Sequence, residues 1–143
     1  MTATFTFRFR VRYGECDAQH IVFNARWADY VDIAATEYTR ALFGAVDASL
    51  DWRLRRQVLE WRAPATFDQV LEARVVTAAV GTTSFTLHTT FHRAGVGEAL
   101  VSAETVYVVV DPETGGKLPV PGGHRAALLA GSDRTVDCAG DRS

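Results

Sequence analysis

The sequence has little of several features that mark specialised classes of protein. Its two cysteines, Cys16 and Cys138, form neither a CxxC pair nor a regular framework, which argues against a disulfide scaffold and a zinc site. No stretch approaches the roughly 18 uninterrupted apolar residues of a membrane span, and the first residues lack the continuous apolar core of a signal peptide. We therefore expect a cytoplasmic protein with no membrane partner.

An excess of charge of one sign is also missing. The 143 residues carry 15 basic and 17 acidic side chains, which give a net charge of −2 and an isoelectric point near 6.1. Such a balance provides no general attraction for nucleic acid, so we expect no nucleic-acid partner. The length and the 48% of hydrophobic residues suit one domain with its own core. We place a single domain over residues 1–130 and a polar, disordered tail over residues 131–143.

Two segments near the start have contrasting periods of hydrophobicity. From Phe5 to Tyr13 every second residue is apolar or aromatic, which predicts a strand with one solvated face. Between Phe23 and Leu42 the apolar residues recur at steps of three and four, which predicts an amphipathic helix of about five turns. Asn24 is the expected N-cap of this helix, and Gly44 is its expected stop.

The pattern in the remainder of the chain is typical of strands. Four strands are expected, over residues 56–63, 70–80, 84–93 and 98–110, and a short helix is expected over residues 124–130. A long helix with one apolar face needs a sheet to cover that face. We therefore predict an α+β fold in which a curved antiparallel β-sheet wraps around one long central α-helix, the hotdog fold. The sheet edge left open in one protomer predicts a homodimer or a homotetramer.

A motif between Arg10 and Trp27 resembles the signature of the 4-hydroxybenzoyl-CoA thioesterase family of hotdog proteins. The matching positions are Tyr13, Glu15, Asp17, Val22, Asn24 and Trp27. Three further stretches, over residues 81–85, 108–111 and 119–121, are similar to later parts of the family, so the resemblance extends from Phe5 to Ala130. The chain departs from the family in carrying His20 in place of a glycine and Trp27 in place of a tyrosine.

The resemblance implies an enzyme that hydrolyses the thioester of an acyl-CoA or of an acyl-carrier protein. Asp17 is the implied catalytic residue, acting as a nucleophile or as a general base. The start of the helix offers unpaired backbone amides near Phe23 and Asn24, which are expected to bind the oxyanion or the substrate. His20 is a further candidate for substrate binding, with a solvated or capping role as the alternative. No metal and no cofactor are expected.

Other interpretations stay open at this stage. A solvated loop carboxylate or a cap is the alternative role for Asp17. The fold also suits an acyl-carrier hydratase or dehydratase, and it suits a non-catalytic acyl-CoA-binding module. Glu15 and Glu37 are interpreted as polar surface acids, and Cys16 lacks the histidine partner of a thiol nucleophile. Aromatic, short-chain and polyketide-derived acyl groups are all compatible with the motif.

Overall fold

The computed structural model describes residues 3–44 and 50–140, and in this part of the chain it contains six strands and two α-helices. The strands are β1 (Phe5–Arg10), β2 (Asp51–Trp61), β3 (Val70–Val80), β4 (Ser84–Arg93), β5 (Ala99–Val110) and β6 (Thr135–Asp137). The helices are α1 (Arg26–Phe43) and α2 (Gly122–Ala130), and a short 3-10 turn, η1, spans Tyr13–Glu15. The prediction of an α+β fold is confirmed.

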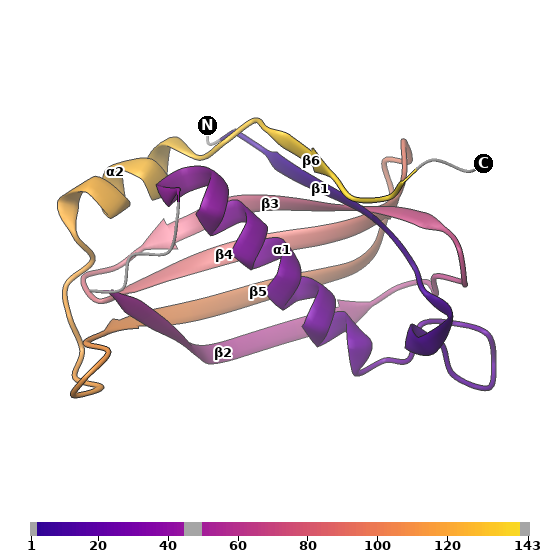
Figure 1. Ribbon diagram of the computed structural model, residues 1–143, viewed down its shortest axis with the longest axis horizontal. Helices are drawn as coiled ribbons and strands as arrows, with labels where there is room; N and C mark the ends of the chain where they lie inside the picture. The colour runs from indigo at the N-terminus through magenta and orange to yellow at the C-terminus, as the bar shows by residue number, and fades with distance from the viewer. Residues whose placement is uncertain (1–2, 45–49, 141–143) are drawn as a thin grey trace.

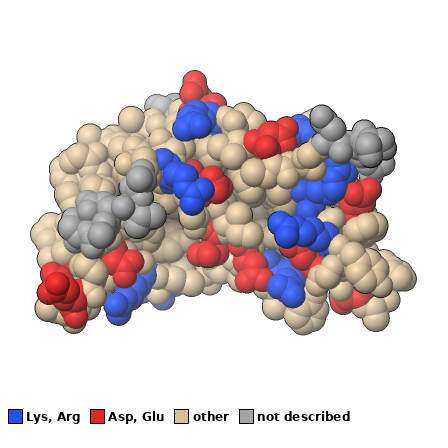
Figure 2. Space-filling model, viewed as in Figure 1, with Lys and Arg blue, Asp and Glu red and all other residues tan. Residues whose placement is uncertain are grey.

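The six strands form one sheet in the order β2-β5-β4-β3-β1-β6. All neighbouring pairs are antiparallel except β1 and β6, which run parallel. Figure 1 shows α1 crossing one face of this sheet, and Figure 2 shows acidic and basic side chains interspersed over the same side of the molecule. The predicted bounds of β3 and β4 are confirmed, because both strands alternate between a buried and a more exposed face.

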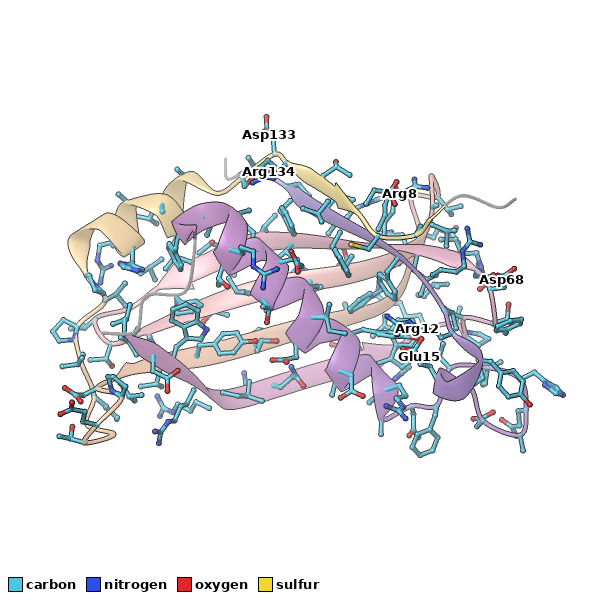
Figure 3. All side chains as sticks on the ribbon, viewed as in Figure 1. Arg8, Arg12, Glu15, Asp68, Asp133 and Arg134 are labelled. Atoms are coloured by element: carbon cyan, nitrogen blue, oxygen red, sulfur yellow. The ribbon has the colours of Figure 1, made fainter. Side chains whose placement is uncertain are left out.

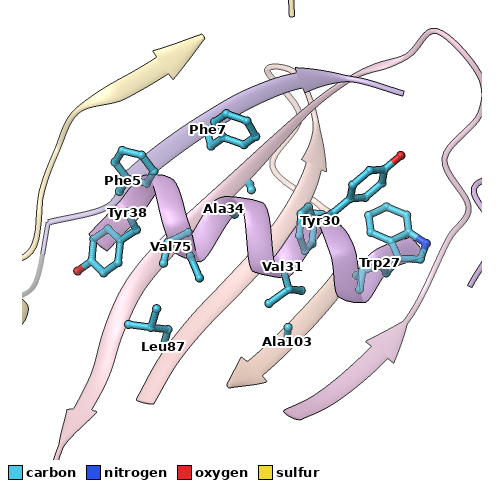
Figure 4. Packing of buried hydrophobic residues seen from close by; sticks show 14 of the residues in the cluster. Phe5, Phe7, Trp27, Tyr30, Val31, Ala34, Tyr38, Val75, Leu87 and Ala103 are labelled. Carbon is cyan, nitrogen blue, oxygen red and sulfur yellow. The ribbon is translucent and has the colours of Figure 1, made fainter. Parts of the chain in front are cut away.

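The core lies between α1 and the face of the sheet that it covers. Side chains at three- and four-residue steps of α1 are buried, namely Trp27, Tyr30, Val31, Ala34, Ala35, Tyr38 and Thr39. They pack against inward-facing strand residues, among which Phe5, Val75 and Leu87 are fully buried (Figure 4). The buried hydroxyl of Tyr38 is satisfied by a 2.8 Å hydrogen bond with Thr77. Each large apolar side chain buried here contributes roughly 2 kcal/mol of transfer free energy, so this interface is a main source of stability.

The start of α1 differs from the prediction. The helix begins at Arg26, its N-cap position is Ala25, and no side chain caps it, so the assignment of Asn24 as the N-cap is wrong. Two turn bonds explain the shift. The N–H of Arg26 donates to the carbonyl oxygen of Phe23 at 2.9 Å, and the N–H of Trp27 donates to that of Asn24 at 3.4 Å. The chain therefore makes one turn before it enters the helix.

The end of α1 agrees with the prediction. The N–H of Gly44 donates to the carbonyl oxygen of Arg40 at 2.9 Å, and its φ of +79° is a left-handed conformation that suits glycine. The predicted short helix is present as α2 and begins two residues earlier than expected. Neither helix in the described residues combines the length and the apolarity needed to cross a membrane.

The segment expected to be a disordered tail is ordered over residues 131–140. Within it, β6 pairs in parallel with the outer edge of β1. The N–H of Thr6 donates to the carbonyl oxygen of Arg134 at 3.0 Å, and the N–H of Cys138 donates to that of Arg8 at 2.8 Å. The edge of β1 would otherwise expose these backbone groups, which explains why a polar segment is held here. Residues 141–143 lie outside the described part.

The opposite edge of the sheet is formed by β2, which starts five residues earlier than predicted. It pairs with β5, and its register shifts at a bulge between Leu54 and Arg56. In the described residues no strand lies on its other side. Leu54 and Trp61 are 56% and 53% exposed although both project from the face that α1 covers. This edge therefore presents both open backbone groups and apolar side chains.

The order of the tail is testable by hydrogen exchange. We expect the amide of Thr6 to be protected in the full chain and to exchange at least about tenfold faster in a chain that ends at Gly131, because its acceptor on Arg134 is then missing. The amide of Val11 is the internal control, since it donates to Gln69 at 2.9 Å and does not depend on the tail. Equal exchange of Thr6 in both chains would contradict an ordered β6.

Candidate active site

Asp17 lies in a tight loop between η1 and α1. Cys16 and Val22 form an antiparallel bridge that closes the loop. Inside it, the N–H of Asp17 donates to the carbonyl oxygen of Ile21 at 2.9 Å, and the N–H of His20 donates to that of Asp17 at 3.0 Å. These bonds define a turn followed by one left-handed residue, a common solution for a short hairpin connection. Both backbone polar groups of Asp17 are thus fixed by the loop.

The left-handed residue of this loop is His20, with a φ of +64°. Glycine adopts this conformation freely, whereas a residue with a Cβ is strained by about 1 kcal/mol or more. The resembled family has glycine at this position, so the loop keeps the backbone conformation that a glycine would favour. The side chain of His20 is exposed, and in the described residues it makes no hydrogen bond. Its backbone conformation is the clearest feature of this residue.

The carboxylate of Asp17 is half-buried, and one of its two oxygens accepts a hydrogen bond. Its Oδ1 accepts the N–H of Gln19 at 2.8 Å, and within residues 3–44 and 50–140 its Oδ2 has no hydrogen-bond partner. Asp17 lines two cavities. One, of about 380 Å³, we name the Tyr13 cavity, and it includes Tyr13, His20 and Phe67. The other, of about 400 Å³, we name the Trp61 cavity; it includes Gln19, Phe23, Asn24, Trp27, Trp61 and Arg62.

The backbone amides before α1 are available in part. The N–H of Phe23 donates to the carbonyl oxygen of Glu15 at 2.9 Å, so the expectation that Phe23 supplies an oxyanion donor is corrected. The next two amides, those of Asn24 and Ala25, find no acceptor in the described part of the chain. They stand at the positive end of the helix dipole, where an anion is stabilised. The available donors are therefore displaced by one residue toward the helix.

Glu15 anchors the loop to α1, a role that the sequence did not reveal. Its Oε1 accepts the N–H of Arg12 and the hydroxyl of Tyr30, both at 2.8 Å. Figure 3 shows Glu15 and Arg12 between β1 and the first half of α1. Burial raises the pKa of Tyr30, and the hydrogen bond to Glu15 and its negative charge raise it further. The phenol therefore remains protonated and acts as the donor.

Two other acidic or nucleophilic candidates have structural roles. Burial raises the pKa of the Cys16 thiol, as do the charges of Glu15 and Asp17, which keeps the sulfur in its less nucleophilic form. Glu37 pairs with Arg40 at 2.6 Å on the same helix. Among these candidates, Asp17 keeps one carboxylate oxygen without a partner in the described residues, and it lines a cavity together with Asn24, whose backbone amide finds no acceptor there.

Comparison with known proteins adds the class of fold. No protein-family model matches the chain, and no curated protein matches its sequence. Among solved structures, the 1,4-dihydroxy-2-naphthoyl-CoA thioesterase of Synechocystis has a TM-score of 0.79 and 17% identity, and the match covers 88% of this chain and 96% of that one. A gentisyl-coenzyme A thioesterase has a TM-score of 0.77 and 23% identity, with 86% and 98% covered.

A third solved structure, the PA5185 protein of Pseudomonas aeruginosa, has a TM-score of 0.82 and 21% identity, with 90% of this chain and 93% of that one covered. All three matches extend over nearly the whole of the compared chains. At these identities the likeness establishes a common fold. The chain therefore has the fold of these proteins, two of which are named as thioesterases acting on aromatic acyl-CoA substrates.

The backbone role of His20 leads to a prediction about stability. Replacement by glycine removes the strain of the left-handed conformation, so we expect His20→Gly to leave the free energy of unfolding unchanged or to raise it by up to about 1 kcal/mol. The β-branched variant His20→Val should lower it by about 1–2 kcal/mol. Urea denaturation of the three chains measures both changes. If His20→Gly is less stable than the original chain by as much as His20→Val is, the imidazole itself stabilises the loop and the strain interpretation is wrong.

Proposed function

We propose that this chain is a hotdog thioesterase, with the sheet wrapped around α1 as its central helix, and that it hydrolyses an acyl-CoA thioester through Asp17. The observation that carries this proposal is that Asp17 and Asn24 line the same cavity, and that in the described residues one oxygen of the Asp17 carboxylate and the backbone amides of Asn24 and Ala25 have no hydrogen-bond partner. Thioester hydrolysis needs a base or nucleophile next to donors for the developing oxyanion. The fold shared with named thioesterases supports the same reaction.

Two routes use this arrangement. As a general base, Asp17 takes a proton from water while the resulting hydroxide attacks the carbonyl carbon. The amides of Asn24 and Ala25 hold the oxyanion, and its collapse expels the thiolate, which takes the proton. As a nucleophile, an Asp17 oxygen attacks the carbonyl carbon and expels the thiolate, which takes a proton from water. A second water molecule then attacks the aspartyl carbonyl of the mixed anhydride, which releases the acid and restores the Asp17 carboxylate. In a single turnover in ¹⁸O-labelled water, only the nucleophilic route leaves label in the carboxylate of Asp17.

The names of two compared proteins support an aromatic acyl group as the substrate. The proteins are named as thioesterases of 1,4-dihydroxy-2-naphthoyl-CoA and gentisyl-coenzyme A, which are both aroyl thioesters. Free CoA rather than a carrier protein is the thiol carrier in both names. We therefore propose an aroyl-CoA as the first substrate to test, with carrier-protein thioesters as the second class.

The central prediction concerns Asp17→Asn, which keeps the size of the side chain and removes its charge. We expect it to lower kcat for thiol release from an aroyl-CoA by about 100-fold or more, because groups that transfer protons or form covalent bonds contribute at least this much. Asp29→Asn is the matched control, since Asp29 is an exposed carboxylate in the first turn of α1 that pairs with Arg26 at 3.2 Å. Its activity should stay within about twofold of the original.

The other outcomes of this experiment are equally definite. If Asp17→Asn is nearly as fast as the original chain, hydrolysis does not use Asp17. If the original chain binds acyl-CoA tightly and releases no thiol from any thioester, the chain is a binding module and the proposed function is wrong. Turnover of an enoyl-CoA or 3-hydroxyacyl-CoA without thiol release would indicate a hydratase.

We further propose that two copies associate along β2. Its open backbone edge and the exposed Leu54 and Val58 are features of a strand that continues into another sheet. Each copy has a mass of 15.7 kDa, and sedimentation equilibrium of the full chain should give twice that mass or a multiple of it. A monomer at micromolar concentration would contradict this assembly.

A further inference from the structure

The surroundings of Asp17 are divided between two cavities rather than gathered in one. The Tyr13 cavity and the Trp61 cavity both include Asp17, and it is the residue that their linings have in common. A thioester likewise has two arms that meet at one carbonyl carbon, the acyl group and the thiol carrier. A carboxylate that acts on that carbon needs space for an arm on each side. The two cavities provide such spaces.

The Tyr13 cavity lies next to a larger one. A cavity of about 440 Å³ lies between β1 and α1, and we name it the β1–α1 cavity. It shares Tyr13 and Phe67 with the Tyr13 cavity. These two rings contact each other edge to face with centroids 5.9 Å apart, and they are 79% and 53% exposed. They therefore form an aromatic boundary between the space at Asp17 and the β1–α1 cavity.

The β1–α1 cavity suits an apolar group with a ring. The largely buried Phe7, Phe9 and Tyr30 line it, together with Ile33 of α1, which is 44% exposed. Its lining also contains charged residues, namely Arg10, Arg12, Glu15 and Asp68. Aromatic side chains bind ring-shaped ligands by edge-to-face or offset contacts. A volume of this size lies within the range of about 300–1,000 Å³ that is usual for small-molecule sites. An acyl group larger than acetyl is needed to fill it.

The Trp61 cavity has a different chemical character. The side-chain amides of Gln19 and Asn24 border it, and neither has a hydrogen-bond partner in the described residues. Arg62 is its cationic residue, and within the same described residues its guanidinium forms no ion pair. The pantetheine arm of CoA contains two amides, each with a donor and an acceptor, and it leads to a phosphorylated nucleotide. Carboxamides and a guanidinium match these groups.

We propose that the two arms of the thioester separate at Asp17, with the acyl group passing Tyr13 and Phe67 into the β1–α1 cavity and the pantetheine arm lying in the Trp61 cavity. This inference rests on the proposed function and extends it. Ile33 is then a specificity-determining residue on the acyl side. Arg62 is a positioning residue for the CoA arm. Neither residue takes part in the chemical step.

The test uses one variant for each cavity. Ile33→Trp fills the β1–α1 cavity from an exposed position of α1, so it should lower kcat/KM for 1-naphthoyl-CoA by about tenfold or more and leave acetyl-CoA within about twofold. Arg62→Gln should lower kcat/KM for naphthoyl-CoA through KM by about tenfold, and it should not affect the N-acetylcysteamine thioester of the same acid, which lacks the nucleotide. Arg134→Gln is the control for Arg62→Gln, because Arg134 is exposed and lies beside β6.

The inference would be overturned if the two variants did not act selectively on the two arms of the substrate. If Ile33→Trp weakens acetyl-CoA and naphthoyl-CoA equally, or if Arg62→Gln changes the preference between acyl groups, the arms are not divided in this way while the thioesterase activity itself stands. If the original chain hydrolyses none of these thioesters, the proposed function fails. The inference about the two cavities is then tested by calorimetric titration of binding. Ile33→Trp must then weaken the binding of naphthoyl-CoA about tenfold without affecting that of free CoA, and any other result overturns it.

Discussion

The bonds that Glu15 makes to the start of α1 determine where Asp17 stands. The side chain of Glu15 accepts the hydroxyl of Tyr30, which is buried in the core, and its carbonyl oxygen accepts the N–H of Phe23. One residue thus fixes the loop to the helix from both its side chain and its backbone. The carboxylate of Asp17, two residues further on, and the free amides before α1 are consequently held in one arrangement. A rigid support of this kind is what a catalytic site requires.

Some strands of the sheet could be predicted from the sequence and others could not. The strands β3 and β4 were predicted with their correct bounds, because one face of each packs on the core and the other does not. The early start of β2 was missed, because an edge strand with both faces partly exposed has no such alternation. The parallel strand β6 was missed for a related reason: three residues are too few to show a period, and their order comes from the open edge of β1.

The site was predicted to a similar degree. Asp17 was proposed from the motif around it and stays a prediction, and the amide of Asn24 finds no acceptor in the described residues. The amide of Phe23 is not available, because its N–H donates to the carbonyl oxygen of Glu15. Such a tertiary contact cannot be predicted from a local sequence pattern. The partnership of Glu15 with Tyr30 was missed on the same ground, since the two lie 15 residues apart on different elements. Local patterns thus predicted a candidate carboxylate, whereas the long-range bonds decide which backbone donors remain without an acceptor near it.

The ordered tail has a practical consequence for labelling. Cys138 follows β6, is exposed, and borders the β1–α1 cavity. Cys16 is the other thiol of the chain, and both its partial burial and its raised pKa slow its reaction with thiol reagents. A thiol-reactive fluorophore applied for a short time at neutral pH would therefore attach mainly to Cys138. The natural sequence thus already carries an optical reporter site at the border of this cavity, and no engineered cysteine is needed.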